Sequence, residues 1–132
     1  MSNNVDIIRA GYGDFLSGNI PGVMERFADE FNFNVAGAPE VPYAGTYGNR
    51  TELMSFFQQL GESVTFSLFE PREYFANGDR VLALGRYEGK VNRSDTPFAT
   101  DWVMAWTIRD GKIVAMQEIC DPAQVRKGFA AA

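Results

Sequence analysis

The sequence contains no histidine, a single cysteine and no run of basic residues, and each scarcity narrows what the protein can do. Without histidine, no histidine-based catalytic dyad or triad can form, and the common histidine-containing zinc sites are excluded. The lone Cys120 allows no disulfide within the chain, so a reducing cytoplasm is the expected compartment. Acid–base chemistry would have to come from Asp, Glu, Tyr, Lys or Cys.

Basic charge and long apolar runs are also scarce. The chain has 12 Lys and Arg against 17 Asp and Glu, a net charge of −5, so no nucleic-acid partner is expected. No apolar stretch approaches the ~20 residues of a membrane span. The first residues lack the basic and apolar regions of a secretory signal. No glycine-rich phosphate loop follows a strand pattern, and neither a cofactor nor a metal is predicted.

Apolar and aromatic residues are abundant, at 45% and 14% of the 132 residues. This composition is typical of a folded globular chain, and the length suits one domain over residues 1–132. Residues 4–60 show mostly helical patterns, separated by a short strand and by loops. We expect helices at 4–17 and 20–30, a strand at 31–36, a Gly- and Pro-rich loop at 37–48, and a helix from Asn49 or Thr51 to Leu60.

From residue 61 onward the pattern has a period of two. It predicts strands at 63–76, 80–92, 98–108 and 112–120, with a bend at Pro71, and a short helix at 123–129. Helices followed by antiparallel strands favour an α+β fold. We therefore predict a cone-shaped, curved, mostly antiparallel sheet wrapped on three N-terminal helices.

Asp110-Gly111 separates the last two strands and is a strong hairpin signal, because the turn requires positive φ. The alternation places Trp102, Met104, Trp106 and Ile108 on one face of the first strand, and Val114, Met116, Glu118 and Cys120 on one face of the second. A carboxylate thus lies in an apolar row. On the strand that starts at Arg80 both faces are largely apolar, which predicts that a second copy of the chain covers the outer face.

The chain resembles the nuclear transport factor 2-like superfamily, and within it the SnoaL-like, ketosteroid isomerase-related branch. Four segments carry the resemblance: FLSGNIPGVMERFADEF, YAGTYGNRTELMSFF, FANGDRVLALGRYEG and WTIRDGKIVAMQEICD. It implies the cystatin-like cone, a homodimer and an interior cavity for a hydrophobic small molecule. The same cone hosts isomerases, polyketide cyclases, epoxide hydrolases and non-catalytic binders, so the reaction stays open.

Glu118 is the first candidate catalytic residue, because a carboxylate among apolar neighbours loses hydration and its pKa rises. Arg86 and Glu88, two residues apart on a strand, share a face. The resemblance to limonene epoxide hydrolase-like proteins implies that Arg86 orients Glu88 and Glu118 as acid and base. The same three side chains could instead form a structural salt-bridge network, in which case the protein would bind a ligand or partner without catalysis.

The chain departs from better-defined relatives at three positions. Phe33 and Val35 stand where the epoxide hydrolase-like proteins keep a Tyr and an Asn, and Met104 stands where the cyclases often place a His. Ligand contacts are predicted for apolar and aromatic residues of the expected cavity and of the loop at its rim. These residues are Phe33, Tyr43, Tyr47, Phe57, Trp102, Met104 and Met116.

Overall fold

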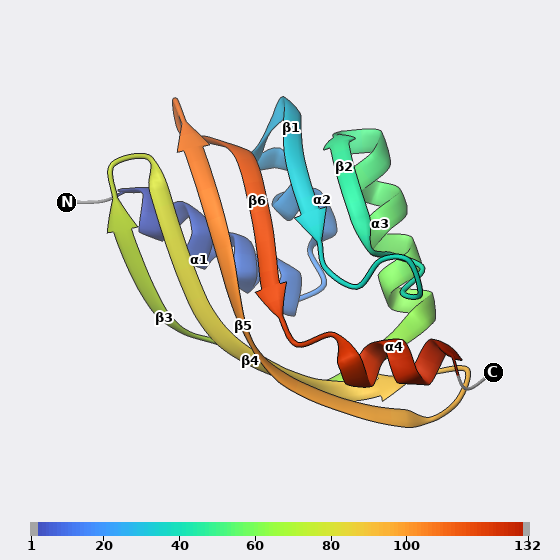
Figure 1. The fold of residues 1–132 in the computed structure, drawn as a ribbon. Helices are drawn as coiled ribbons and strands as arrows, with labels where there is room; N and C mark the ends of the chain where they lie inside the picture. The colour runs from blue at the N-terminus through green and yellow to red at the C-terminus, as the bar shows by residue number, and fades with distance from the viewer. Residues whose placement is uncertain (1–2, 131–132) are drawn as a thin grey trace.

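The computed structural model describes residues 3–130, in which four helices surround one curved six-stranded sheet (Figure 1). In chain order the elements are α1 (Asn3–Leu16), α2 (Ile20–Glu25), β1 (Phe27–Val35), β2 (Gly45–Asn49), α3 (Arg50–Ser63), β3 (Val64–Asn77), β4 (Arg80–Val91), β5 (Thr96–Arg109), β6 (Lys112–Cys120) and α4 (Ala123–Ala130).

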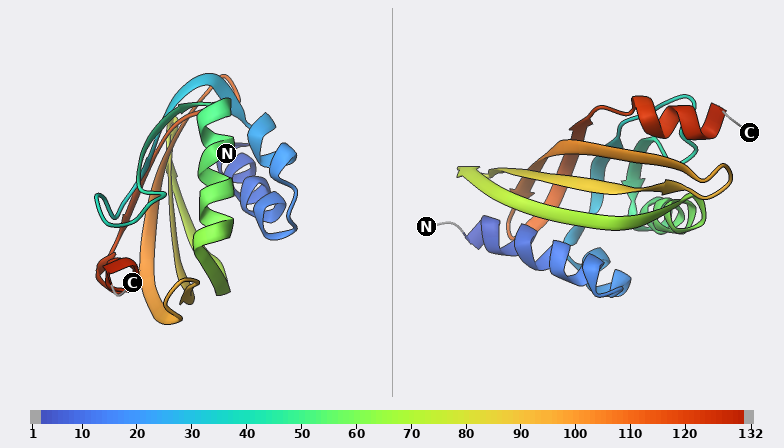
Figure 2. Two further views of the ribbon diagram at one scale, coloured as in Figure 1. Left: turned by 90° about the vertical axis from the view of Figure 1, so that its right-hand side faces the viewer. Right: turned by 90° about the horizontal axis from the view of Figure 1, so that it is seen from below.

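The sheet has the strand order β2-β1-β6-β5-β4-β3, and only the pairing of β1 with β6 is parallel. Helices α1, α2 and α3 lie against its concave face, while α4 packs at the end of β4 and β5 (Figure 2). The predicted α+β cone with a mostly antiparallel sheet is confirmed. Within residues 3–130, no helix has the length and hydrophobicity that crossing a bilayer requires.

The second helix is shorter than the sequence pattern indicates. It ends at Glu25, and β1 begins at Phe27, inside the segment expected to be helical. Phe27, Phe31 and Phe33 are buried and pack ring against ring, so burial of aromatic side chains on the sheet overrides the local helical spacing. A register shift between Glu30 and Phe33 lets the strand absorb the irregular pattern.

The long Gly- and Pro-rich segment is a loop only up to residue 44. From Gly45 it forms β2, which pairs with β1 and leads directly into α3. Asn49 caps this helix as predicted, because its side-chain oxygen accepts the backbone N–H of Glu52 at 2.9 Å. Leu53 and Phe56 form the buried face of α3 against the interior of the cone.

The hairpin at Asp110-Gly111 forms as predicted, with φ of +51° and +77° at its two central residues. The residues of this hairpin that face the interior differ from the predicted set at one position. Thr107 pairs with Ala115 whereas Ile108 pairs with Ile113, so Val114 is an extra residue in a bulge. The expected inward position of Val114 is therefore wrong, and Ile113 is buried in its place.

Candidate functional site

Glu118 lies inside the cone, on β6, with only 8% of its surface exposed. One carboxylate oxygen, Oε1, accepts the backbone N–H of Ala36 at 3.2 Å. The other, Oε2, accepts the hydroxyl of Tyr87 at 3.1 Å. Ala36 follows the end of β1 and Tyr87 lies on β4, so three separate strands fix the orientation of this carboxyl group.

The surroundings of Glu118 favour its neutral form. Burial raises the pKa of Glu118, and the hydrogen bonds from Ala36 and Tyr87 offset part of that rise because they stabilise the charged form. The pKa values of Tyr87 and Tyr43 are also raised, first by burial and next by the nearby charge of Glu118. Both phenols therefore keep their protons, and that of Tyr87 is donated to Glu118 in a hydrogen bond.

A cavity of about 50 Å³ lies against Glu118. Apart from Glu118 and two tyrosines its walls are apolar, and they come from strands β1, β3, β4, β5 and β6, from α3 and from the loop before β2. The lining residues are Phe33, Val35, Tyr43, Phe56, Leu60, Phe66, Phe69, Tyr87, Met104, Met116 and Glu118. We call this space the Glu118 compartment.

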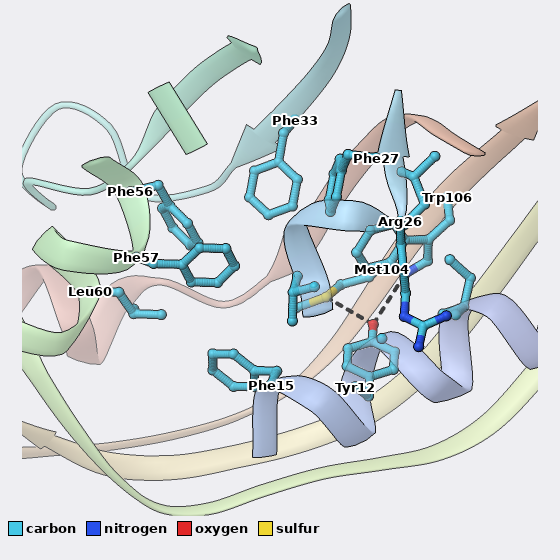
Figure 3. Close-up of a pocket in the computed structure, with 14 residues that line it drawn as sticks. Tyr12, Phe15, Arg26, Phe27, Phe33, Phe56, Phe57, Leu60, Met104 and Trp106 are labelled. Atoms are coloured by element: carbon cyan, nitrogen blue, oxygen red, sulfur yellow. Dashed lines mark hydrogen bonds between the residues drawn. The ribbon is translucent and has the colours of Figure 1, made fainter. Parts of the chain in front are cut away.

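A second space of about 80 Å³ lies nearer to α1 and α2 and is shown in Figure 3. We call it the Tyr12 compartment. The Tyr12 hydroxyl donates to the sulfur of Met104 at 3.1 Å and accepts the indole N–H of Trp106 at 3.1 Å. Burial raises the pKa of Tyr12, so its hydroxyl stays protonated. Four side chains line both compartments and separate them: Phe33, Phe56, Leu60 and Met104.

Most of the side chains predicted to contact a ligand line these spaces. Phe33, Tyr43, Met104 and Met116 line the Glu118 compartment, and Phe57 lines the Tyr12 compartment.

Tyr47 and Trp102 have other positions. Tyr47 is half-buried, and its hydroxyl donates to the backbone carbonyl of Tyr43 at 2.7 Å. This hydrogen bond holds the loop that carries Tyr43. Trp102 is buried between Tyr12 and Phe69, and its ring lies across Gly85, where an added Cβ would come within 2.4 Å of the indole. Both residues therefore support the walls of the site.

Arg86 and Glu88 do not join Glu118. The Arg86 guanidinium bonds Glu88 at 2.8 Å and Asp101 at 3.2 Å, on the outer face of β4 and β5. Because side chains alternate along a strand and Tyr87 points inward, its two neighbours must point outward. The predicted arrangement of Arg86 between two acids is therefore wrong, and the structural salt bridge is what forms, with Asp101 in place of Glu118.

Tyr87 and Ala36 are the partners that sequence reasoning missed. A signal for Tyr87 exists: Val81, Ala83 and Gly85 precede it at a spacing of two, and small apolar residues suit the crowded inner face of a bent sheet. No sequence signal identifies the N–H of Ala36, because its position depends on where β1 ends beside β6. Among residues 3–130, no cluster of three or more potential metal ligands occurs.

Comparison with known proteins agrees with this architecture. Residues 8–116 match the SnoaL-like domain, so the chain belongs to the SnoaL-like family. A nuclear transport factor 2-like protein from Burkholderia xenovorans LB400 is 29% identical, with a TM-score of 0.86 and coverage of 96% of this chain and 95% of that one. A nuclear transport factor 2-like protein from Burkholderia pseudomallei K96243 is 22% identical, with a TM-score of 0.88 and 98% coverage of both chains.

The structure of TerC, co-crystallised with polyporic acid, is 27% identical to this chain. Its TM-score is 0.86, and the alignment covers 98% of this chain and 99% of TerC. None of the curated proteins matches the sequence significantly. The match to the SnoaL-like domain establishes the family, and the similar structures agree with its fold.

Proposed function

We propose that the protein is a cofactor-independent acid–base enzyme that acts on a hydrophobic small molecule inside the cone. The observation that carries this proposal is Glu118, a buried carboxyl group that lines an otherwise apolar cavity and is held by two hydrogen bonds. A carboxylate with a raised pKa is a stronger base than one in water, which suits it to proton abstraction near neutral pH. TerC, a similar protein that was co-crystallised with polyporic acid, supports a small-molecule ligand.

Each oxygen of Glu118 accepts one hydrogen bond and keeps a second lone pair free. In the proposed reaction, Glu118 takes the proton as a C–H bond beside a carbonyl breaks, and the electron pair moves to the carbonyl oxygen. Tyr43, a protonated phenol in the same compartment, is positioned to donate to that oxygen. Where a carbon–carbon double bond is conjugated with this enolate, return of the proton to the far carbon of that bond gives isomerisation. Where the enolate carbon attacks a second carbonyl of the substrate, a carbon–carbon bond forms, Glu118 gives the proton to the new alkoxide, and the product is cyclic.

Epoxide hydrolysis is less well supported than these two reactions. It would require a second acid beside Glu118, and Glu88 lies on the other face of the sheet with Arg86. Phe33 and Val35 line the cavity and cannot hold an attacking water. We therefore rank isomerase and cyclase chemistry above hydrolysis.

A generic carbon acid tests the proposal. 5-Nitrobenzisoxazole opens to a coloured phenolate when a base removes its ring proton, and we expect a protein-dependent rate that rises with pH as Glu118 ionises. Glu118→Gln should lower the rate to that of buffer. Arg86→Ala is the matched control, because it removes a charged residue from the outer face and should leave the rate unchanged. A Glu118→Gln protein that is folded and as active as wild type would refute the proposal.

The second candidate is a non-catalytic binding module of the same fold. It is favoured by the hydrogen bonds that already satisfy Glu118 and by the aromatic side chains that fill most of the cone. A protein that binds ligands in the cavity, yet shows no Glu118-dependent proton transfer with any carbon acid, would be such a module.

We also propose a homodimer through the outer sheet face, in the cytoplasm. Leu82 and Ile119 are 40% and 55% exposed, and the register places Leu84 and Val103 between them. Apolar side chains on a sheet face favour burial against a second copy. Sedimentation equilibrium should give twice the chain mass for wild type and the chain mass for Ile119→Glu. A monomeric wild type would refute this interface.

A further inference from the structure

We propose that residues 38–44 form a hinged lid over the Glu118 compartment, which side chains of α4 and β2 hold shut. The proposal rests on the proposed function, because it concerns access to the same site. Glu118 is 8% exposed and Met116, in the same compartment, is 3% exposed. A ligand can therefore reach the carboxyl group only if part of the surrounding wall moves.

The other walls of the compartment belong to the fixed framework of the fold. The five strands that line it are hydrogen-bonded into one sheet. Helix α3 is anchored by Leu53, whose side chain is fully buried. Displacing either of these walls would open the core, so it would require unfolding of much of the molecule. The loop before β2 is the wall that can move alone.

Two glycines flank the lid and can act as its hinges. Gly37 and Gly45 have φ of +120° and +132°, a region of backbone conformation that other residues rarely adopt. Between them, the N–H of Val41 donates to the carbonyl of Gly37, and the N–H of Ala44 donates to the carbonyl of Val41, both at 3.1 Å. These hydrogen bonds lie within the segment itself, so it can move as one body.

The buried side of the lid carries Val41 and Tyr43, which are 3% and 8% exposed. Tyr43 lines the Glu118 compartment, and its ring meets those of Phe56 and Phe129 edge to face at 6.2 and 6.3 Å. Lifting the lid therefore removes one wall of the compartment. Closing it returns the Tyr43 hydroxyl to the site, where the proposed reaction needs a donor.

Three contacts hold the lid shut from outside. On α4, Nη2 of Arg126 donates to the carbonyl of Ala38 at 3.3 Å, and Nε of Arg126 lies 3.2 Å from Oε1 of Glu40. On β2, the hydroxyl of Tyr47 donates to the carbonyl of Tyr43 at 2.7 Å. Figure 1 shows the loop between β1 and β2 beside α4. Each of these contacts must break when the lid opens.

Helix α4 is a rigid support for the lid. Its side chains Val125 and Phe129 are buried, and the side-chain oxygen of Gln124 accepts the backbone N–H of Ala99 at 2.9 Å. Gly128 lets the helix approach β4 closely, since an added Cβ would come within 2.4 Å of Val91. The lid is therefore the part that moves, and α4 stays on the sheet.

Labelling of two introduced thiols tests the proposal without any substrate. In a Cys120→Ser background, Val41→Cys places a thiol on the buried side of the lid and Met116→Cys places one inside the compartment. Methyl methanethiosulfonate reacts with a buried thiol only when the protein opens, so the rate, followed by mass spectrometry, reports the open population. Arg126→Ala and Tyr47→Phe should each speed the labelling of both thiols by about fivefold.

Two further variants separate lid opening from unfolding. Nothing lies within 4 Å of a Cβ added at Gly45, so Gly45→Ala acts only through its backbone torsion and should speed the labelling of both thiols at least about fivefold. Ile108→Val is the matched control. Ile108 is buried on β5 and lines neither compartment, so the substitution weakens the whole fold by a similar factor and should leave both rates unchanged.

Equal acceleration by Ile108→Val and Arg126→Ala would show that the thiols are exposed by unfolding, and it overturns the lid. Acceleration at Val41→Cys but not at Met116→Cys would show that the loop moves without opening the compartment, and it also overturns the lid. Lid-dependent labelling without Glu118-dependent proton transfer refutes the enzyme alone. Glu118-dependent proton transfer with labelling that ignores the lid variants refutes the lid alone.

Discussion

Replacement of Tyr87 by Phe removes one hydroxyl group from the site and keeps the ring that surrounds it. The hydroxyl donates to Oε2 of Glu118 at 3.1 Å, and both residues are buried. The ring stacks on Phe69 at 5.9 Å and meets Phe98 edge to face at 5.9 Å, contacts that Phe can keep. The substitution therefore isolates the hydrogen bond.

The cost of this change depends on the charge of Glu118. A hydrogen bond to a charged group contributes about 1.5–3 kcal/mol to stability, and one between neutral groups about 0.5–1.5 kcal/mol. We therefore expect Tyr87→Phe to lose about 1 kcal/mol more when Glu118 is ionised than when it is protonated. Because this hydrogen bond lowers the pKa of Glu118, the variant also moves that pKa further up.

The sign of the pH dependence follows from the raised pKa. Because folding raises the pKa of Glu118, the protonated group contributes stability that is fully present below its unfolded pKa of about 4.3 and is lost as pH rises through the folded pKa. Tyr87→Phe extends that loss to higher pH, so the gap between variant and wild type should widen as pH increases.

Urea unfolding followed by tryptophan fluorescence, at about pH 5 and about pH 9, measures this gap through the unfolding midpoint. Tyr74→Phe is the matched control. Its ring is half-buried under Arg9, its hydroxyl makes no hydrogen bond within residues 3–130, and its stability should change by less than about 0.5 kcal/mol at either pH. An equal loss at both pH values for Tyr87→Phe would show that Glu118 keeps one ionisation state between them, which would contradict the expected pH dependence.

Four further outcomes are expected. Glu118→Gln should remove the fall in unfolding free energy that wild type shows as pH rises, measured by the same urea titrations. Asn49→Ala removes the cap of α3 and should cost about 1 kcal/mol in unfolding free energy, whereas an unchanged midpoint would contradict the cap. Gly85→Ala should cost about 1–3 kcal/mol, since its Cβ would come within 2.4 Å of Trp102, and retained stability would contradict this packing. Burial raises the pKa of Cys120 to about 11, so its alkylation near neutral pH should be slow in the folded protein and fast in urea.

Much of the fold can be predicted from the sequence because its strongest signals are local. Asp110-Gly111 requires a turn with positive φ, Asn49 can cap only the helix that follows it, and the period of two after residue 61 specifies long strands. The predictions fail where packing between segments distant in the sequence determines the local structure. Phe27 adopts strand conformation because its ring packs against Phe31 on the sheet. Val114 lies in a bulge that depends on how β6 pairs with β5.

The candidate site was predictable only in part, for the same reason. Glu118 stands out because a carboxylate in an apolar row is unusual on any strand. Both faces of β4 carry apolar side chains, and only the small residues Val81, Ala83 and Gly85 distinguish the inner face. Only the register of the whole sheet brings Tyr87 to Glu118 and leaves Arg86 with Asp101.

The most direct test of the proposed role of Glu118 is its own titration. Carbon-13 NMR of the side-chain carboxyl groups, with Glu118→Gln to assign the signal, follows its ionisation without any knowledge of the substrate. We predict a single midpoint above the ordinary glutamate value of about 4.3, and a still higher midpoint in Tyr87→Phe. A midpoint at or below that ordinary value would contradict a buried carboxyl base inside the cone.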